Sequence, residues 1–96
     1  MSAKRVLIVE DDPIESLGLD DMMKHLGYEV TAIAISGEAA IGMAAQDRPD
    51  LVLMDILLAG RVNGIEAARK IRDTQHVPII FVSACGTKPQ GGSAEI

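Results

Sequence analysis

Cysteine and long apolar runs are both scarce in this 96-residue sequence. The single cysteine, Cys85, has no partner for an internal disulfide and no His or Cys cluster beside it, which predicts an inert thiol in a reducing compartment. No apolar run approaches the roughly 18 residues of a membrane span, and the N-terminal residues lack the apolar core of a signal peptide. We therefore expect a cytoplasmic protein with no membrane partner.

Basic charge is also in the minority. The chain has 14 acidic and 9 basic residues and a net charge of −5, which argues against binding to a phosphate backbone. We expect no nucleic-acid partner. The length allows one domain, near the lower end of the range for an α/β fold.

The sequence does contain several short apolar segments that are separated by helical patterns. The segments expected to form strands are residues 5–9, 28–35, 51–55 and 77–83. Successive apolar residues within the first and third indicate strands that are buried on both faces, as in parallel sheets. Short connections and right-handed crossovers then predict an α/β fold with a doubly wound parallel sheet.

The pattern stops after residue 84, so we expect a domain at residues 1–85 and a Gly- and Pro-rich tail at residues 86–96.

Three helices are expected between the strands, at about residues 13–26, 37–46 and 65–72. The first has Asp12 as N-cap, Pro13 at the first helical position and Gly27 as its C-terminal stop. The apolar residues expected to face the core are Ile14, Leu17, Met22 and Leu26 in the first helix and Ile65, Ala68 and Ile71 in the third.

Carboxylates follow two of the buried strands. Asp55 ends the segment at 51–55, and because an ionised carboxylate is costly inside a sheet, we expect it in the solvent-filled crevice at the carboxyl ends of the strands. A lone Asp at such a place is usually a turn or cap residue. Glu10 and Asp11, however, lie between the first strand and its helix cap, where capping does not require them.

If the first and third strands are neighbours, these three carboxylates converge. Their repulsion is relieved either by proton uptake or by a hard divalent cation, and Mg²⁺ suits a small, water-rich carboxylate site. Ser83 ends the fourth strand on the same rim. Residues arranged in this way suit the transfer of a phosphoryl group to a carboxylate. Asp55 would be the nucleophile, Asp11 and Asp55 would hold Mg²⁺, and Ser83 would donate a hydrogen bond to a phosphoryl oxygen.

Four motifs then occur in order and at suitable spacing, at residues 9–13 (VEDDP), 53–56 (LMDI), 63–68 (NGIEAA) and 78–84 (PIIFVSA). Together they resemble the receiver domain of two-component response regulators. The resemblance implies a flavodoxin-like fold with strand order 2-1-3-4. It also implies that Asp55 is the phospho-acceptor, Glu10 and Asp11 form the acidic pocket, the backbone carbonyl of Leu57 completes the metal site, and Ser83 is the switch hydroxyl. The implied phosphoryl donor is a phosphohistidine of a histidine kinase or phosphotransfer protein.

The resemblance covers residues 4 to about 85. A family member would continue with a fourth helix, a fifth strand ending in a lysine and a fifth helix, so we expect a receiver domain truncated after the fourth strand. The segment at 77–83 would then be an apolar sheet edge, which predicts a homodimer or another self-association through it. Two alternatives stay open. One is a pseudo-receiver that binds partners without phosphoryl chemistry. The other is a small Mg²⁺-dependent phosphohydrolase, for which an acid/base carboxylate two residues after Asp55 would be evidence, but that position is Leu57.

Overall fold

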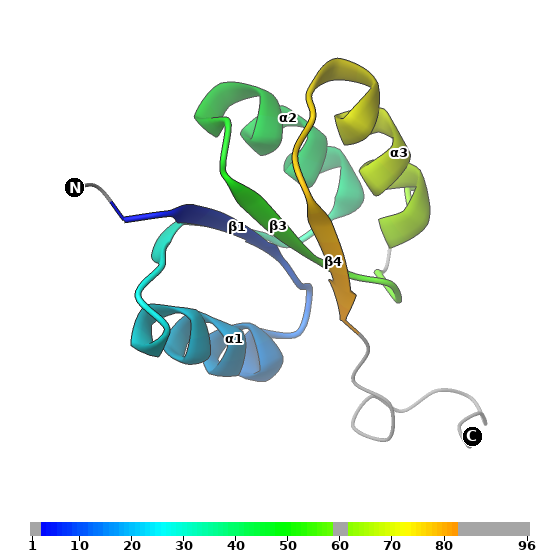
Figure 1. Ribbon diagram of the computed structural model, residues 1–96. Helices are drawn as coiled ribbons and strands as arrows, with labels where there is room; N and C mark the ends of the chain where they lie inside the picture. Colours follow the sequence, from blue (N-terminus) through cyan, green and yellow to red (C-terminus); the bar gives the residue numbers. More distant parts are fainter. Residues whose placement is uncertain (1–2, 59–61, 83–96) are drawn as a thin grey trace.

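Strands and helices alternate along the chain in the computed structural model, which describes residues 3–58 and 62–82 (Figure 1). The elements are β1 (Arg5–Val9), α1 (Pro13–His25), β2 (Glu29–Ala34), α2 (Gly37–Asp47), β3 (Leu51–Asp55), α3 (Gly64–Thr74) and β4 (Ile79–Val82). The strands pair in parallel in the order β2-β1-β3-β4. The predicted fold class and strand order are confirmed, whereas the predicted domain boundary near residue 85 and the tail lie outside the described residues.

The helix ends follow local sequence signals. Asp12 caps α1 by accepting hydrogen bonds from the backbone nitrogens of Ile14 (2.9 Å) and Glu15 (3.3 Å). Gly27 follows the end of α1 with a φ of +93°, the left-handed conformation that a glycine adopts without strain. Both expected boundaries of the first helix are therefore present.

α3 begins with a capping box that was not predicted from the sequence. The Asn63 side chain accepts a hydrogen bond from the Glu66 nitrogen (2.9 Å), and the Glu66 carboxylate accepts one from the Asn63 nitrogen (3.2 Å). The sequence shows the spacing of Asn63 and Glu66, but the helix was expected to begin only at residue 65, which leaves Asn63 outside the cap position.

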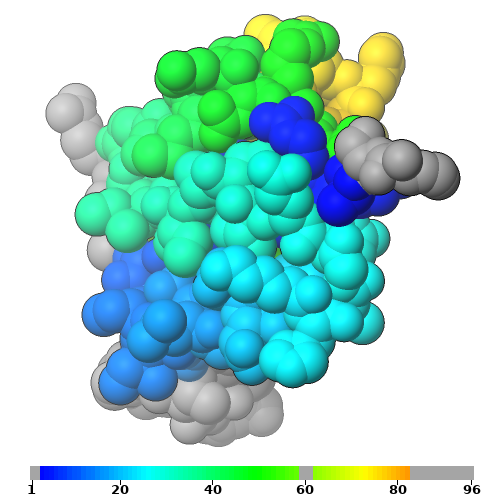
Figure 2. All heavy atoms as spheres, turned by 90° about the vertical axis from the view of Figure 1, so that its left-hand side faces the viewer, coloured from blue at the N-terminus to red at the C-terminus, as the bar shows by residue number. Residues whose placement is uncertain are grey.

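Two helices cover one face of the sheet and a single helix covers the other. α2 and α3 lie together on one side, and α1 lies on the opposite side (Figure 1). Viewed toward the β2 edge, β2 (cyan) lies between α1 (blue) and α2 (blue-green) (Figure 2). Alternate strand residues point to each face. The face under α2 and α3 buries Leu7, Val9, Val52 and Met54 against helical alanines, and the other face buries Val6, Ile8, Leu51 and Leu53 against Met23.

The predicted inward face of α1 is wrong. Ile14 and Leu17 are 79% and 67% exposed, and Met22 and Leu26 are also exposed. The buried residues of α1 are instead Ser16 and Met23. Ser16 can occupy an inward position because its hydroxyl donates a hydrogen bond to the carbonyl oxygen of Pro13 at 3.0 Å, which satisfies the polar group.

The predicted inward face of α3 is correct at two of its three positions. Ala68 and Ile71 are buried, whereas Ile65 is exposed. Gly64 and Ala67 are buried as well, so the inward stripe of α3 runs along Gly64, Ala67, Ala68 and Ile71 from its first residue.

Among the described residues, β4 pairs with β3 alone and forms an edge of the sheet. Its two central residues, Ile80 and Phe81, are 51% and 43% exposed, although they point to opposite faces. Within the part of the chain that the structure describes, no helix is long and apolar enough to cross a membrane.

Candidate functional site

The acidic residues that follow β1 and β3 lie together because these strands are neighbours in register. Val9 is paired with Met54, so the chain after β1 runs beside Asp55 at the end of β3. The backbone nitrogen of Glu10 donates a hydrogen bond to the carbonyl oxygen of Ala34 at 2.9 Å, which extends the pairing with β2 by one residue. Asp11 then begins the turn into α1.

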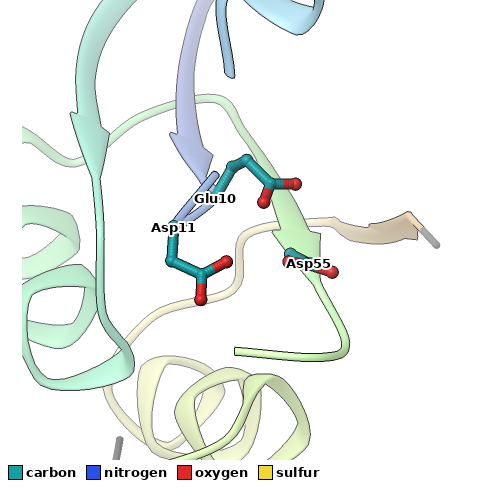
Figure 3. Close-up of side chains that lie close together, drawn as sticks. All are labelled: Glu10, Asp11 and Asp55. Carbon is teal, nitrogen blue, oxygen red and sulfur yellow. The ribbon is translucent and has the colours of Figure 1, made fainter. Parts of the chain in front are cut away.

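The structure brings the side chains of Glu10, Asp11 and Asp55 together (Figure 3). Each offers a carboxylate oxygen, and these three oxygens lie within 4.8 Å of one another. Figure 3 shows that Glu10 and Asp11 come from the end of β1 and Asp55 from the end of β3. The arrangement is the convergence that the strand ends suggested, while the roles of the residues stay predictions.

The site is more enclosed than the sequence suggested. Asp55 is 1% exposed and Glu10 is 2% exposed, and Asp11 is half-buried. Asp55 was expected in a solvent-filled crevice, but as the last residue of β3 it is still paired with Val82 of β4. Buried carboxylates are costly unless they are hydrogen-bonded, paired or bound to a metal, so the partners of Glu10 and Asp55 decide how the site holds its charge.

Backbone amides fix two of the carboxylates. The Leu57 nitrogen donates a hydrogen bond to Oδ1 of Asp55 at 3.1 Å, and the Asp12 nitrogen donates one to Oε2 of Glu10 at 3.0 Å. In each case the donor lies two residues after the acceptor, so the turn that follows the strand orients the carboxylate at its end.

The donor set fits a hard divalent cation. All three side chains offer oxygen, the ligand that Mg²⁺ prefers, and Mg²⁺ usually keeps several waters as ligands. Two oxygens bound to one Mg²⁺ at about 2.1 Å are at most about 4.2 Å apart, so a small side-chain movement or a water-mediated contact adapts the observed cluster. The backbone carbonyl of Leu57 remains a predicted ligand, and Ser83 lies outside the described residues.

Gly64, which was not predicted as a site residue, also lies against this site. A Cβ on Gly64 would overlap the carbonyl oxygen of Asp55 and lie 3.1 Å from the Cα of Ile56. The sequence signal was a glycine directly after the cap residue Asn63, but its contact with Asp55 depends on the tertiary fold.

Comparisons with family models, known sequences and solved structures all point to the same family. The family model described as the response regulator receiver domain matches residues 6–94. The chain is 37% identical over 81 residues to the transcriptional regulatory protein PdtaR of Mycobacterium tuberculosis. The alignment covers 84% of this chain and 39% of that protein. The chain thus spans about two-fifths of the length of this relative.

Solved structures share both the fold and part of the sequence. The signal receiver domain of a modulated diguanylate cyclase from Desulfovibrio desulfuricans G20 has a TM-score of 0.81 and 36% identity, covering 85% of this chain and 65% of that chain. The anti-anti-sigma factor PhyR of Bartonella quintana, solved in complex with the anti-sigma factor NepR, has a TM-score of 0.77 and 37% identity. That match covers 82% of this chain and 33% of the PhyR chain.

Proposed function

This chain belongs to the receiver domains of two-component response regulators, and from that premise we propose that Asp55 accepts a phosphoryl group from a phosphohistidine of a histidine kinase or phosphotransfer protein. The observation that supports this proposal is the cluster of the buried Glu10 and Asp55 with the half-buried Asp11, in which the Leu57 amide orients Asp55. The cluster lies at the carboxyl ends of parallel strands, where open α/β sheets bind their ligands.

In the proposed step, a carboxylate oxygen of Asp55 attacks the phosphorus of the phosphohistidine. The oxygen–phosphorus bond forms and the phosphorus–nitrogen bond breaks, and the imidazole nitrogen keeps the electron pair and takes up a proton. The Leu57 amide holds the attacking carboxylate in one orientation. Mg²⁺ held by Asp11, Asp55 and the Leu57 carbonyl, with Glu10 in the same pocket, would neutralise charge on the phosphoryl oxygens. Ser83 is the proposed hydroxyl donor to the transferred group.

Exposed apolar side chains near the acidic cluster favour a protein as the phosphoryl donor. Ile14 lies three residues after Asp11, Leu57 lies two residues after Asp55, and Ile35 follows the residue that accepts the Glu10 amide hydrogen bond. All three side chains are exposed. Exposed large apolar side chains beside the residues of a polar site favour a protein partner. We expect the transfer to take place in the cytoplasm.

A second candidate function is a protein-binding module without phosphoryl chemistry. The observation that favours it is the likeness to PhyR of Bartonella quintana, whose structure contains an anti-sigma factor. The exposed residues around the acidic cluster would serve such a partner equally well.

Metal binding and phosphorylation separate these candidates. We expect Mg²⁺ to bind in the millimolar range, because few protein ligands and several retained waters make a weak site. An NMR titration should show shifts at Asp55 and Leu57 that are lost in Asp11→Ala and kept in Asp73→Asn, a control on the exposed side of α3. Mass spectrometry after incubation with acetyl phosphate and Mg²⁺ should show one added phosphoryl group in the native chain and none in Asp55→Asn.

The outcomes of this experiment are distinct. Mg²⁺ shifts that persist in both Asp11→Ala and Asp55→Asn would contradict the site. Mg²⁺ binding at Asp55 without phosphorylation, from either acetyl phosphate or a phosphorylated kinase, would favour the protein-binding module.

We also propose self-association through β4. Ile80 and Phe81 expose large apolar side chains on the two faces of this edge strand. An apolar edge is a template for a strand of another copy, so two chains would pair edge to edge. Light scattering over a concentration series should show a mass that rises with concentration, and a constant monomer mass would contradict the proposal.

A further inference from the structure

The first residue of α2 lies unusually close to the segment that leads into α3. Gly37 is buried, and a Cβ on it would overlap the carbonyl oxygen of Val62 and lie 2.9 Å from Cγ1 of that residue. Among the described residues, positive φ at glycine occurs at Gly27 and not at Gly37. Gly37 is therefore needed for close approach and not for backbone conformation.

Two residues after Val62, the same segment meets the backbone of Asp55. A Cβ on Gly64 would overlap the Asp55 carbonyl oxygen. Between these contacts lies Asn63, which the reciprocal hydrogen bonds with Glu66 hold in place. Residues 62–64 thus link the start of α2 to the peptide of Asp55.

Neither helix is free to retreat from this link. α2 buries Ala40 and Ala44 completely, and α3 buries Ala67 completely and Ile71 almost completely in the same core cluster. Close-packed interiors of this kind transmit displacement, because no void is available to absorb it. A group added at the start of α2 would therefore displace residues 62–64, and Gly64 in this segment contacts the Asp55 backbone.

We propose that Gly37 is a positioning residue for the Asp55 site. It fixes residues 62–64, which in turn fix the Asp55 peptide and the hydrogen bond from the Leu57 nitrogen to Asp55 Oδ1. The inference rests on the proposed function, since it assigns to Gly37 a part in the geometry of that same site. By linkage, an event at Asp55 is also felt at the start of α2.

The test compares Gly37→Ala with Gly42→Ala in the full chain. Gly42 is a matched control, because it lies in the same helix and its ideal Cβ has no atom within 4 Å. In metal-free protein we expect the amide resonances of Asp55 and Leu57 to shift in Gly37→Ala and to stay in place in Gly42→Ala. We expect the Mg²⁺ affinity to fall by roughly 2- to 30-fold in Gly37→Ala alone.

A merely structural role would lower stability and leave the Mg²⁺ affinity of the folded protein unchanged, so affinities are measured where each variant is folded. Unchanged Asp55 and Leu57 resonances in folded Gly37→Ala would overturn the inference and leave the proposed function standing. A native chain that binds no Mg²⁺ and accepts no phosphoryl group would instead overturn the proposed function, and the metal-free comparison still decides the inference.

Should Gly37→Ala fail to fold, the native chain provides the second measurement. Titration with Mg²⁺ should then shift the amide resonances of Gly37 and Val62 and spare Gly42. A Gly37 resonance that does not move as the Asp55 resonance titrates would overturn the inference.

Discussion

The two sides of the sheet are covered in different ways. On the side of α2 and α3, the helices contribute mainly small residues such as Ala40, Ala44 and Ala67, which are completely buried. On the other side, α1 buries Met23 and leaves Ile14 and other large apolar residues exposed. On the first side small residues allow the helix and sheet backbones to approach closely, whereas on the second side large apolar side chains of α1 are exposed to solvent.

The strands themselves do not explain this difference. Leu7 and Ile8 are neighbours in β1, point to opposite faces, and are both completely buried. The contrast therefore comes from the helices. The tightly packed side supports the loop segment beside Asp55, and the open surface of α1 begins directly after the acidic residues Glu10 and Asp11.

The largest expected effect is on the tightly packed side. Leu7→Ala should lower the free energy of unfolding by about 2–5 kcal/mol, because the removed side chain leaves a cavity that small helical residues cannot fill. Leu17→Ala, at an exposed position of α1, is the control. It should change the free energy of unfolding by at most about 0.5 kcal/mol. Chemical denaturation measures both. Equal effects of the two substitutions would contradict the exposed position of Leu17 on α1.

The cap of α3 should have a smaller effect. Asn63→Ala removes the side-chain acceptor of the capping box and should cost about 0.5–2 kcal/mol of the unfolding free energy. Glu66→Gln is the control, since glutamine can still accept the hydrogen bond from the Asn63 nitrogen and should be nearly neutral. Thermal unfolding followed by circular dichroism checks both variants. A neutral Asn63→Ala would show that packing alone fixes the start of α3.

The fold was predictable because its signals are local and repeated. Residues 5–9 and 51–55 are short apolar runs, and Asp12 and Gly27 mark the ends of the helix between the first two strands. The inward face of α1 was not predictable from periodicity, since that helix has apolar residues on several sides. Ser16 is buried there through a hydrogen bond that only the structure shows.

The candidate site was predictable in its members and not in its surroundings. The rule that parallel strands end at one edge of the sheet was enough to bring Glu10 and Asp55 together. The burial of Asp55 depends on tertiary contacts such as its pairing with Val82 of β4, and the contacts of Gly37 and Gly64 join segments far apart in the sequence. No local pattern encodes such distances.

The smallest effect on stability, and the most informative for the open side, is expected for Leu17→Gln. Leu17 is 67% exposed and glutamine is a good helix former, so the free energy of unfolding should change by at most about 0.5 kcal/mol. If this surface of α1 receives the phosphoryl donor, transfer from a kinase that phosphorylates the native chain should slow by about 5- to 10-fold, which corresponds to the loss of about 1 kcal/mol of binding. Phosphorylation by acetyl phosphate should not change, since a small donor does not contact α1.

Arg69→Gln on the exposed surface of α3 is the control for a change of side chain away from the α1 surface. An equal loss with both donors would mean that the substitution disturbs the acidic cluster itself, and an unchanged rate with the kinase would place the donor's contacts away from Leu17.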